Sequence, residues 1–301
     1  MLKALEPYAS LPREFRKSRP SAWALANRPG AAVDSFLEGP VFDRDGNLYV
    51  TDIPFGRIFR IDREKRWSLV AEYDGEPNGL KFAAADTLLI ADYKNGLLSL
   101  HLPSGRIAPL LERRNTERFK GINDLTFDGQ GNLYFTDQGQ TGMHDPTGRV
   151  YRLRKDGGLD MLLTNVPSPN GLVLDLSGHI LYVAATRGNC VWRVPLQPDG
   201  SASKVGIFFS TNGPSGPDGL ALDSLGRLIV ANPGLGRVWV LDEYAQPELI
   251  LEGTRGALLT NVAFGGEGGR RLFVTDSGSG SILCADLEAP GAPVFSGAPA
   301  Q

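Results

Sequence analysis

One sequence pattern recurs six times along the 301-residue chain. Each copy begins with a polar residue and continues with a short apolar run, a turn rich in Gly, Asp or Asn, and a second apolar run that often ends in Thr-Asp. The polar residues that open the copies are Glu38, Asn78, Asn123, Asn170, Asp218 and Asn261. They are separated by 40, 45, 47, 48 and 43 residues, a period typical of propeller blades.

The apolar runs have the composition of β-strands. They are short and rich in β-branched and aromatic residues, and turns such as Asp45-Gly46-Asn47 join them into hairpins. Third and weaker fourth runs follow, as in RIFRID from Arg57 and WSLVAE from Trp67. The 37 glycines and 21 prolines exclude a helical solenoid. The pattern therefore predicts an all-β, six-bladed β-propeller with four antiparallel strands per blade and a central metal-binding channel.

The repeat sets the expected domain boundaries. Blades should begin near residues 38, 77, 122, 169, 217 and 260, within one propeller domain over residues 31–301. Residues 1–30 lie outside the repeat and are expected to form an N-terminal extension. Trp23 and Leu25 in this extension could cover either a blade or the bottom of the channel.

Composition narrows the classes of partner. The net charge is −3 and both signs are mixed along the chain, so no basic surface is expected for nucleic acid. No segment approaches the roughly 20 apolar residues that span a bilayer, and no secretory signal is recognised, so the expected location is the cytoplasm and no membrane partner is expected. Cys190 and Cys284 each lie in an apolar run, which is typical of reduced core thiols.

The six opening residues are expected to meet at one end of the channel. In a propeller the first strand of each blade lines the channel, so these two carboxylates and four amides should form a ring at its mouth. The expected walls below the ring are Val41, Phe42, Leu80, Leu125, Phe127, Leu172, Leu220 and Val262. Many oxygen ligands without Cys or His favour one divalent ion, with Ca²⁺ preferred and Zn²⁺, Mn²⁺ or Fe²⁺ possible.

A simpler explanation is that these residues only form turns. Asn-Gly and Asp-Gly are common turn dipeptides, and the dipeptides that fit this explanation are Asn78-Gly79, Asn170-Gly171 and Asp218-Gly219. Glu38-Gly39 and Asn123-Asp124 fit it poorly, so the metal interpretation is preferred. The Thr-Asp endings are interpreted as structural rather than functional, because they recur in most blades. They indicate turn capping by Asp52, Asp92, Asp137 and Asp276, with Asn232 in the fifth copy.

A long loop in the third blade is a candidate rim of the site. It runs from Gln138 to Gly148, on the same face as the ring, and its glycines should make it pliable. Gln138 and His144 in this loop are candidate substrate contacts. His144 is also an alternative proton-transfer group, although a loop histidine is more often only exposed.

Over roughly residues 33–296, the chain resembles the SMP-30/gluconolactonase/LRE-like family of six-bladed propellers. It resembles the paraoxonases and diisopropylfluorophosphatase more distantly. The matching motifs are Glu38-Gly39-Pro40, Asn123-Asp124-Leu125 followed by GNLYFTD, Pro169-Asn170-Gly171, Pro217-Asp218-Gly219 and Asn261-Val-Ala-Phe-Gly-Gly. The resemblance implies Glu38, Asn123, Asn170 and Asp218 as metal ligands. It further implies Asn78 and Asn261 as substrate-pocket residues and Asp124 as a supporting or acid–base residue.

The resulting functional hypothesis is a metal-dependent lactonase acting on a small lactone, and the expected substrates are sugar-acid lactones such as aldonolactones. Metal polarisation of the carbonyl would assist attack by water, with Asp218 or Asp124 as general base. No G-x-S-x-G motif is present, which disfavours an acyl-enzyme. The alternatives are an esterase or phosphotriesterase of the same fold, and a non-catalytic ligand-binding propeller that Ca²⁺ stabilises.

Overall fold

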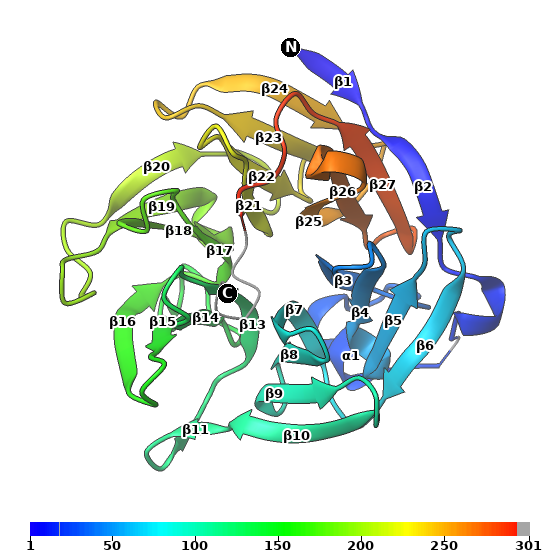
Figure 1. Ribbon diagram of the computed structural model, residues 1–301, viewed down its shortest axis with the longest axis horizontal. Helices are drawn as coiled ribbons and strands as arrows, with labels where there is room; N and C mark the ends of the chain where they lie inside the picture. The colour runs from blue at the N-terminus through cyan, green and yellow to red at the C-terminus, as the bar shows by residue number, and fades with distance from the viewer. Residues whose placement is uncertain (18, 294–301) are drawn as a thin grey trace.

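The computed structural model describes residues 1–17 and 19–293, and it has six β-sheets arranged radially around a central channel (Figure 1). Within each sheet, neighbouring blade strands are antiparallel and follow one another from the channel outward. The predicted six-bladed propeller with four strands per blade is therefore confirmed. Within the described part of the chain, no helix is both long enough and apolar enough to cross a bilayer.

The first three blades follow the repeat directly. The first contains β3 (Leu37–Phe42), β4 (Leu48–Asp52), β5 (Arg57–Ile61) and β6 (Trp67–Glu72). The second contains β7 (Pro77–Ala84), β8 (Thr87–Asp92), β9 (Gly96–His101) and β10 (Arg106–Leu111). The third contains β13 (Ile122–Phe127), β14 (Leu133–Asp137), β15 (Gly148–Leu153) and β16 (Leu159–Val166). A small hairpin of β11 (Arg113–Arg114) and β12 (Glu117–Arg118) joins the second blade to the third.

Of the last three blades, the fifth and the sixth also include strands from the N-terminus. The fourth contains β17 (Pro169–Leu174), β18 (Ile180–Ala185), β19 (Cys190–Pro195) and β20 (Gly206–Ser210). The fifth contains β21 (Leu220–Leu222), β22 (Leu228–Asn232), β23 (Arg237–Leu241) and β24 (Pro247–Glu252), with β1 (Leu2–Ala4) added in parallel outside β24. The sixth contains β25 (Leu259–Gly265), β26 (Arg271–Asp276) and β27 (Ser281–Asp286), and β2 (Glu6–Ser10) is its fourth strand.

The N-terminal segment thus closes the propeller. β2 pairs antiparallel with β27, with Glu6 opposite Cys284 and Ser10 opposite Ser281 (Figure 1). Tyr8 packs edge-on against Phe273, with ring centroids 4.8 Å apart. These residues lie within the expected N-terminal extension, which the repeat could not assign to a blade because the sixth copy ends before a fourth strand.

The rest of the extension crosses to the face that carries the ring. α1 (Ala22–Asn27) is capped by Ser21, whose hydroxyl accepts a hydrogen bond from the Ala24 amide. Trp23 is buried against Phe36, with ring centroids 4.7 Å apart, whereas Leu25 remains exposed. This helix lies against η2 (Ile53–Phe55) of the first blade.

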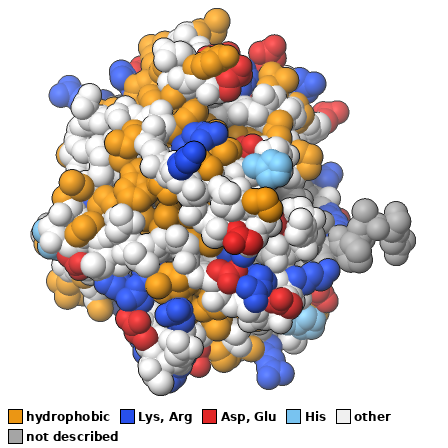
Figure 2. Space-filling view, turned by 90° about the vertical axis from the view of Figure 1, so that its left-hand side faces the viewer, with side chains coloured by type: hydrophobic (Ala, Val, Ile, Leu, Met, Phe, Trp, Pro, Cys, Tyr) orange, Lys and Arg blue, Asp and Glu red, His pale blue; other side chains and the backbone are white. Residues whose placement is uncertain are grey.

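The apolar core lies between the blades. Ile58 of β5, Leu80 of β7 and Leu88 of β8 belong to one buried cluster, and equivalent clusters join the other neighbouring sheets. Cys190 and Cys284 are buried and free, as predicted for core thiols. On the flank of the propeller in Figure 2, acidic and basic side chains are interspersed with apolar ones.

The aspartates of the Thr-Asp endings cap the connections that lead into their own blades. The aspartates accept hydrogen bonds from the preceding connection, as Asp52 does from the Phe36 amide and Asp276 from the Leu258 amide. These contacts, repeated at Asp92 and Asp137, confirm the predicted capping. The prediction was wrong for Asn232, whose buried amide has no hydrogen-bond partner among the described residues.

Candidate functional site

Five inner strands have an irregularity in register near the residue that opens each repeat. In β13, for example, Ile122 pairs with Asp137 and the next registered residue is Leu125, so Asn123 and Asp124 have no ladder partner. The other shifts fall after Glu38, Pro77, Pro169 and Leu259. Bulges of this kind re-aim side chains. They turn the polar residues toward the channel at one end of the propeller.

Threonine side chains from neighbouring blades fix these bulges. Thr51 donates to the Asn78 carbonyl at 2.9 Å, and Thr136 donates to the Asn170 carbonyl at 2.9 Å. Thr186 donates to the Pro217 carbonyl, next to Asp218, at 2.7 Å. Each hydroxyl connects the second strand of one blade, or the turn after it, to the segment that begins the next blade. The ring is therefore held by contacts between blades.

Three of the glycines beside the ring residues provide space rather than turns. Gly79, Gly171 and Gly219 have no left-handed φ, so the turn explanation does not account for them. A Cβ on Gly171 would lie 2.4 Å from the carbonyl oxygen of Asp218, and a Cβ on Gly219 would lie 2.2 Å from Asn261 Oδ1. Only glycine leaves room for the ring residue of the following blade.

Gly171→Ala should therefore loosen the ring. We expect the free energy of unfolding to fall by about 1–3 kcal/mol, because the added methyl group must displace backbone. Urea unfolding measures this change. Gly129→Ala is the matched control, since a Cβ there meets nothing within 4 Å. Equal stability of the two variants would contradict the close packing described here.

The ring faces a cavity of about 980 Å³, here called the mouth cavity. Of the predicted site residues, those that line it are Glu38, Asn78, Asn123, Gln138, Asn170 and Asp218. Their side chains come from all blades except the sixth. All six except Gln138 are less than 10% exposed. The structure therefore brings the four predicted metal ligands together at one opening.

Two buried carboxylates dominate the electrostatics of the mouth cavity. Burial raises the pKa of Glu38 to about 7, against hydrogen bonds that the Gly39 amide and Asn261 Nδ2 donate to its Oε2, each 2.8 Å long. Burial also raises the pKa of Asp218 well above its usual value, and the charges of Glu38 and Asp124 add to this rise. A carboxylate pair with this preference for protons is suited to binding a cation.

One amide oxygen in the ring has no partner. Asn123 Nδ2 donates to Gln138 Oε1 at 2.9 Å, which sets the orientation of the amide. Asn123 Oδ1 is buried and accepts no hydrogen bond within the described residues. An orphaned carbonyl oxygen beside two carboxylates fits a hard divalent cation. No group of three His, Cys, Asp or Glu side chains suited to a metal occurs in residues 1–17 and 19–293, so such a site would depend on amide oxygens.

Asp124 and Asn261 do not line the mouth cavity. Asn261 was predicted to contact substrate, but its Nδ2 donates to Glu38 and its Oδ1 accepts from the Val262 amide at 2.8 Å. It therefore positions a ring carboxylate. Asp124 is buried and accepts a 2.8 Å hydrogen bond from the Leu125 amide. Burial raises the pKa of Asp124, and the charge of Lys81 opposes this rise.

The third-blade loop is held at its beginning. Gln138 Nε2 donates to Ser168 Oγ at 3.0 Å, and the Thr141 hydroxyl donates to the Gln138 carbonyl at 2.6 Å. Gln138 lines the mouth cavity, and its role as a substrate contact stays a prediction. His144 is exposed and does not line it, because the chain turns away through the Gly142–Asp145 bridge.

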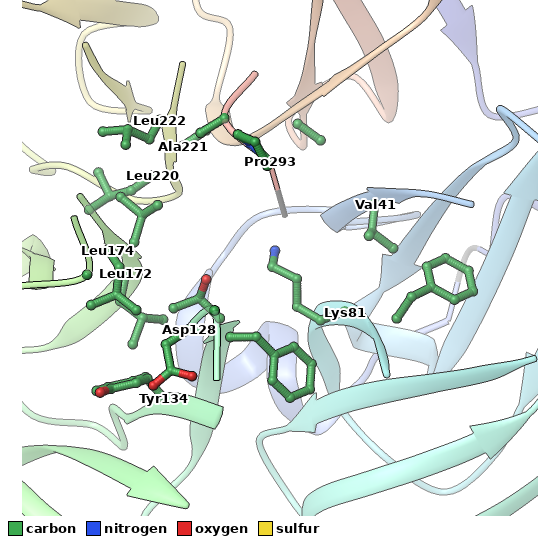
Figure 3. A pocket seen from close by; sticks show the side chains of 18 of the residues that line it. Val41, Lys81, Asp128, Tyr134, Leu172, Leu174, Leu220, Ala221, Leu222 and Pro293 are labelled. Carbon is green, nitrogen blue, oxygen red and sulfur yellow. The ribbon is translucent and has the colours of Figure 1, made fainter. Parts of the chain in front are cut away.

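A larger cavity of about 1300 Å³ lies at the opposite end of the channel (Figure 3). Its walls include Leu172 and Leu220, and Lys81 reaches into it from β7. Leu80 and Leu125, predicted as wall residues, instead pack within the clusters between blades. Despite its size, this cavity lacks the ring carboxylates, so we place the functional site at the mouth cavity.

Two groups of mouth-cavity residues were missed by sequence reasoning. Trp23, Asn27 and Arg28 reach it from the N-terminal extension, and Arg187 reaches it from η3 (Thr186–Gly188). Asn27 Oδ1 accepts a 3.2 Å hydrogen bond from Gln140 Nε2, which connects α1 to the third-blade loop. No repeat motif marks these residues. The position of Arg187 directly after the threonine of a strand ending was the only available signal.

The fold and the ring define a six-bladed propeller with an oxygen-rich polar site at one mouth of its channel. The chain belongs to the SMP-30/gluconolactonase/LRE-like family, whose characteristic region matches residues 36–278.

Curated relatives and solved structures agree with this assignment. The lactonase drp35 of Staphylococcus haemolyticus is 30% identical over 225 residues, covering 70% of this chain and 67% of the relative. The lactonase drp35 of Staphylococcus aureus is 30% identical over 223 residues, covering 70% and 68%. A gluconolactonase from Xanthomonas campestris superposes with a TM-score of 0.73 at 22% identity, covering 95% and 97% of the two chains. A calcium-binding regucalcin from Agrobacterium tumefaciens gives 0.73 at 21%, covering 96% and 97%.

Proposed function

We propose that the ring is the active site of a metal-dependent lactonase that hydrolyses a small sugar-acid lactone. The lactonase class is supported by the family and by the two staphylococcal relatives. The observation that carries the metal dependence is the orphaned Asn123 Oδ1 beside two buried carboxylates. Calcium is favoured because the donors are carboxylate and amide oxygens, and a fold neighbour is described as calcium-binding.

Glu38, Asn123, Asn170 and Asp218 would hold the ion. A bound divalent ion supplies Lewis-acid stabilisation of the negative charge that develops on a carbonyl oxygen during hydrolysis. Asn261 orients Glu38, and Gln138 orients Asn123, so both donors are preorganised by neighbouring amides. Glu38 and Asn123 are therefore each fixed by a side chain of another segment.

Asp218 is the proposed general base. Its carboxylate faces the mouth cavity, where a water can lie beside a bound ester, and burial raises its pKa, which makes it a stronger proton acceptor. Asp124 is assigned a supporting role, because it is buried outside the mouth cavity. The proton would pass from the attacking water to the Asp218 carboxylate and then to the leaving hydroxyl.

The polar walls favour a hydroxylated substrate. Asn78, Gln138, Ser168 and the phenol of Tyr93 line the mouth cavity and can exchange hydrogen bonds with sugar hydroxyls. An apolar ester would add no hydrogen bonds to those that Gln138, Ser168 and Tyr93 already make with other side chains. This difference separates a sugar lactone from the aryl esters and phosphotriesters that the same fold could accept.

The purified protein should contain about one divalent ion per chain. Elemental analysis tests this, and chelation should lower both the melting temperature and lactone hydrolysis, because ion binding stabilises the folded state. Adding Ca²⁺ back should restore both, and Mn²⁺, Zn²⁺ and Fe²⁺ serve as comparisons. A panel of hydroxylated lactones, alkyl lactones, aryl esters and phosphotriesters tests the substrate class.

Two results would contradict this proposal in different ways. Protein that contains no ion and shows no thermal shift with any of the four metals would refute the metal site. Metal-loaded protein that binds an ion but hydrolyses nothing on the panel would instead favour a ligand-binding propeller that the ion stabilises.

A further inference from the structure

The mouth cavity carries arginines whose charges are not balanced by an ion pair. Arg28, Arg187 and Arg255 line it and form no hydrogen bond or ion pair through their side chains within the described residues. Arg237 differs, because it pairs with Glu252 at 2.7 Å. Guanidinium groups recognise carboxylate and phosphate with paired hydrogen bonds. Unpaired guanidinium groups around an opening therefore indicate an anionic ligand.

Arg187 is the arginine that the structure relates most directly to the ring. Its amide donates to the Pro167 carbonyl at 3.2 Å, and the hydroxyl of the preceding Thr186 donates to the Pro217 carbonyl at 2.7 Å. These two connections lead into the segments that carry Asn170, in β17, and Asp218, which precedes β21. The backbone of Arg187 is thus fixed to two proposed metal-binding segments.

The Arg187 side chain is exposed and lines the mouth cavity. A Cβ on Gly142 would lie 3.6 Å from the Cβ of Arg187, so the third-blade loop packs beside the base of the arginine side chain. Because Arg187 also lines the mouth cavity, it is placed to meet a substrate that enters there.

We infer that Arg187 selects a lactone that carries an anionic group, such as a second carboxylate, away from its ester. The inference rests on the proposed function and specifies its substrate class. With the ester at the ring, the anionic group would reach the rim and pair with Arg187. Arg28 and Arg255 add positive potential around the same opening. The preferred class would be lactones of aldaric acids rather than neutral aldonolactones.

The test compares lactones that differ in charge. We expect the metal-loaded protein to hydrolyse glucaro-1,4-lactone with a higher kcat/KM than glucono-δ-lactone. A phosphorylated gluconolactone distinguishes carboxylate from phosphate as the anionic group. Arg187→Gln should lower kcat/KM for the anionic lactone by about 10- to 100-fold, mainly through KM, and change the neutral lactone less than threefold. Arg187→Lys should recover part of the loss.

Arg193→Gln is the matched control. Arg193 is exposed on β19 of the same blade, outside the mouth cavity, so its removal should leave both substrates unaffected. Equal losses of activity on neutral and anionic lactones in Arg187→Gln would overturn the inference, because they would show that Arg187 acts only through the ring. A wild-type preference for the neutral lactone would overturn it as well.

Calorimetry provides a readout that needs no turnover. The ring-opened dicarboxylate should bind the wild-type protein more tightly than the monocarboxylate, and Arg187→Gln should abolish the difference. If no lactone is hydrolysed but this difference is present, the proposed function fails and the anion site stands. If lactones are hydrolysed but the difference is absent, the anion site fails alone.

Discussion

Asp218→Asn should lower kcat by about 100-fold or more at saturating metal. The substitution keeps the shape of the side chain but removes a carboxylate that lines the mouth cavity and is the proposed proton acceptor. It should also weaken ion binding, because one of the two ring carboxylates is lost. Kinetics at increasing Ca²⁺ concentrations separate these effects, since saturation restores occupancy but cannot restore the base.

Two control variants show whether the loss is specific. Asp156→Asn changes an exposed aspartate in a turn of the third blade and should leave kcat unchanged. His144→Ala removes an exposed residue of the third-blade loop and should at most alter KM or substrate preference. If His144→Ala abolished turnover with the ion still bound, the base would have to be reassigned to His144. Near-normal kcat in Asp218→Asn would place the active site elsewhere.

Deleting residues 1–10 should destabilise the protein by about 5 kcal/mol or more. The deletion removes β2 from the sixth blade, and each ladder hydrogen bond lost with it costs about 1 kcal/mol of stability. It also removes the buried Leu5 and the half-buried Tyr8, and the burial of a whole apolar side chain contributes roughly 1.5–3 kcal/mol. It also exposes the edge of β27, which favours aggregation. Urea unfolding and light scattering measure the two consequences.

Deleting only residues 1–4 is the informative comparison. This deletion removes β1, which pairs with β24 outside a blade that already has four strands, and its residues are exposed. We expect a much smaller loss of stability and no aggregation. If both deletions had the same effect, closure of the sixth blade by β2 would not be what stabilises the propeller.

The repeat alone determined the architecture and the ring positions. Blade strands have a local signature of short β-branched runs between turns, and six copies at a blade-like spacing leave few alternatives. Because every copy places its polar residue at the same point, the sequence also predicted that Glu38, Asn123, Asn170 and Asp218 would meet. The structure brings these four side chains to one cavity.

Tertiary structure decided what each residue does at the mouth. Gly171 is required by the Asp218 carbonyl of the next blade, and Asn261 is engaged by Glu38, 223 positions away along the chain. Such contacts depend on how neighbouring blades pack and have no local sequence signature. Closure by β2, the position of α1 and the placement of Arg187 were likewise settled only in three dimensions, because these segments lie outside the repeat or between its copies.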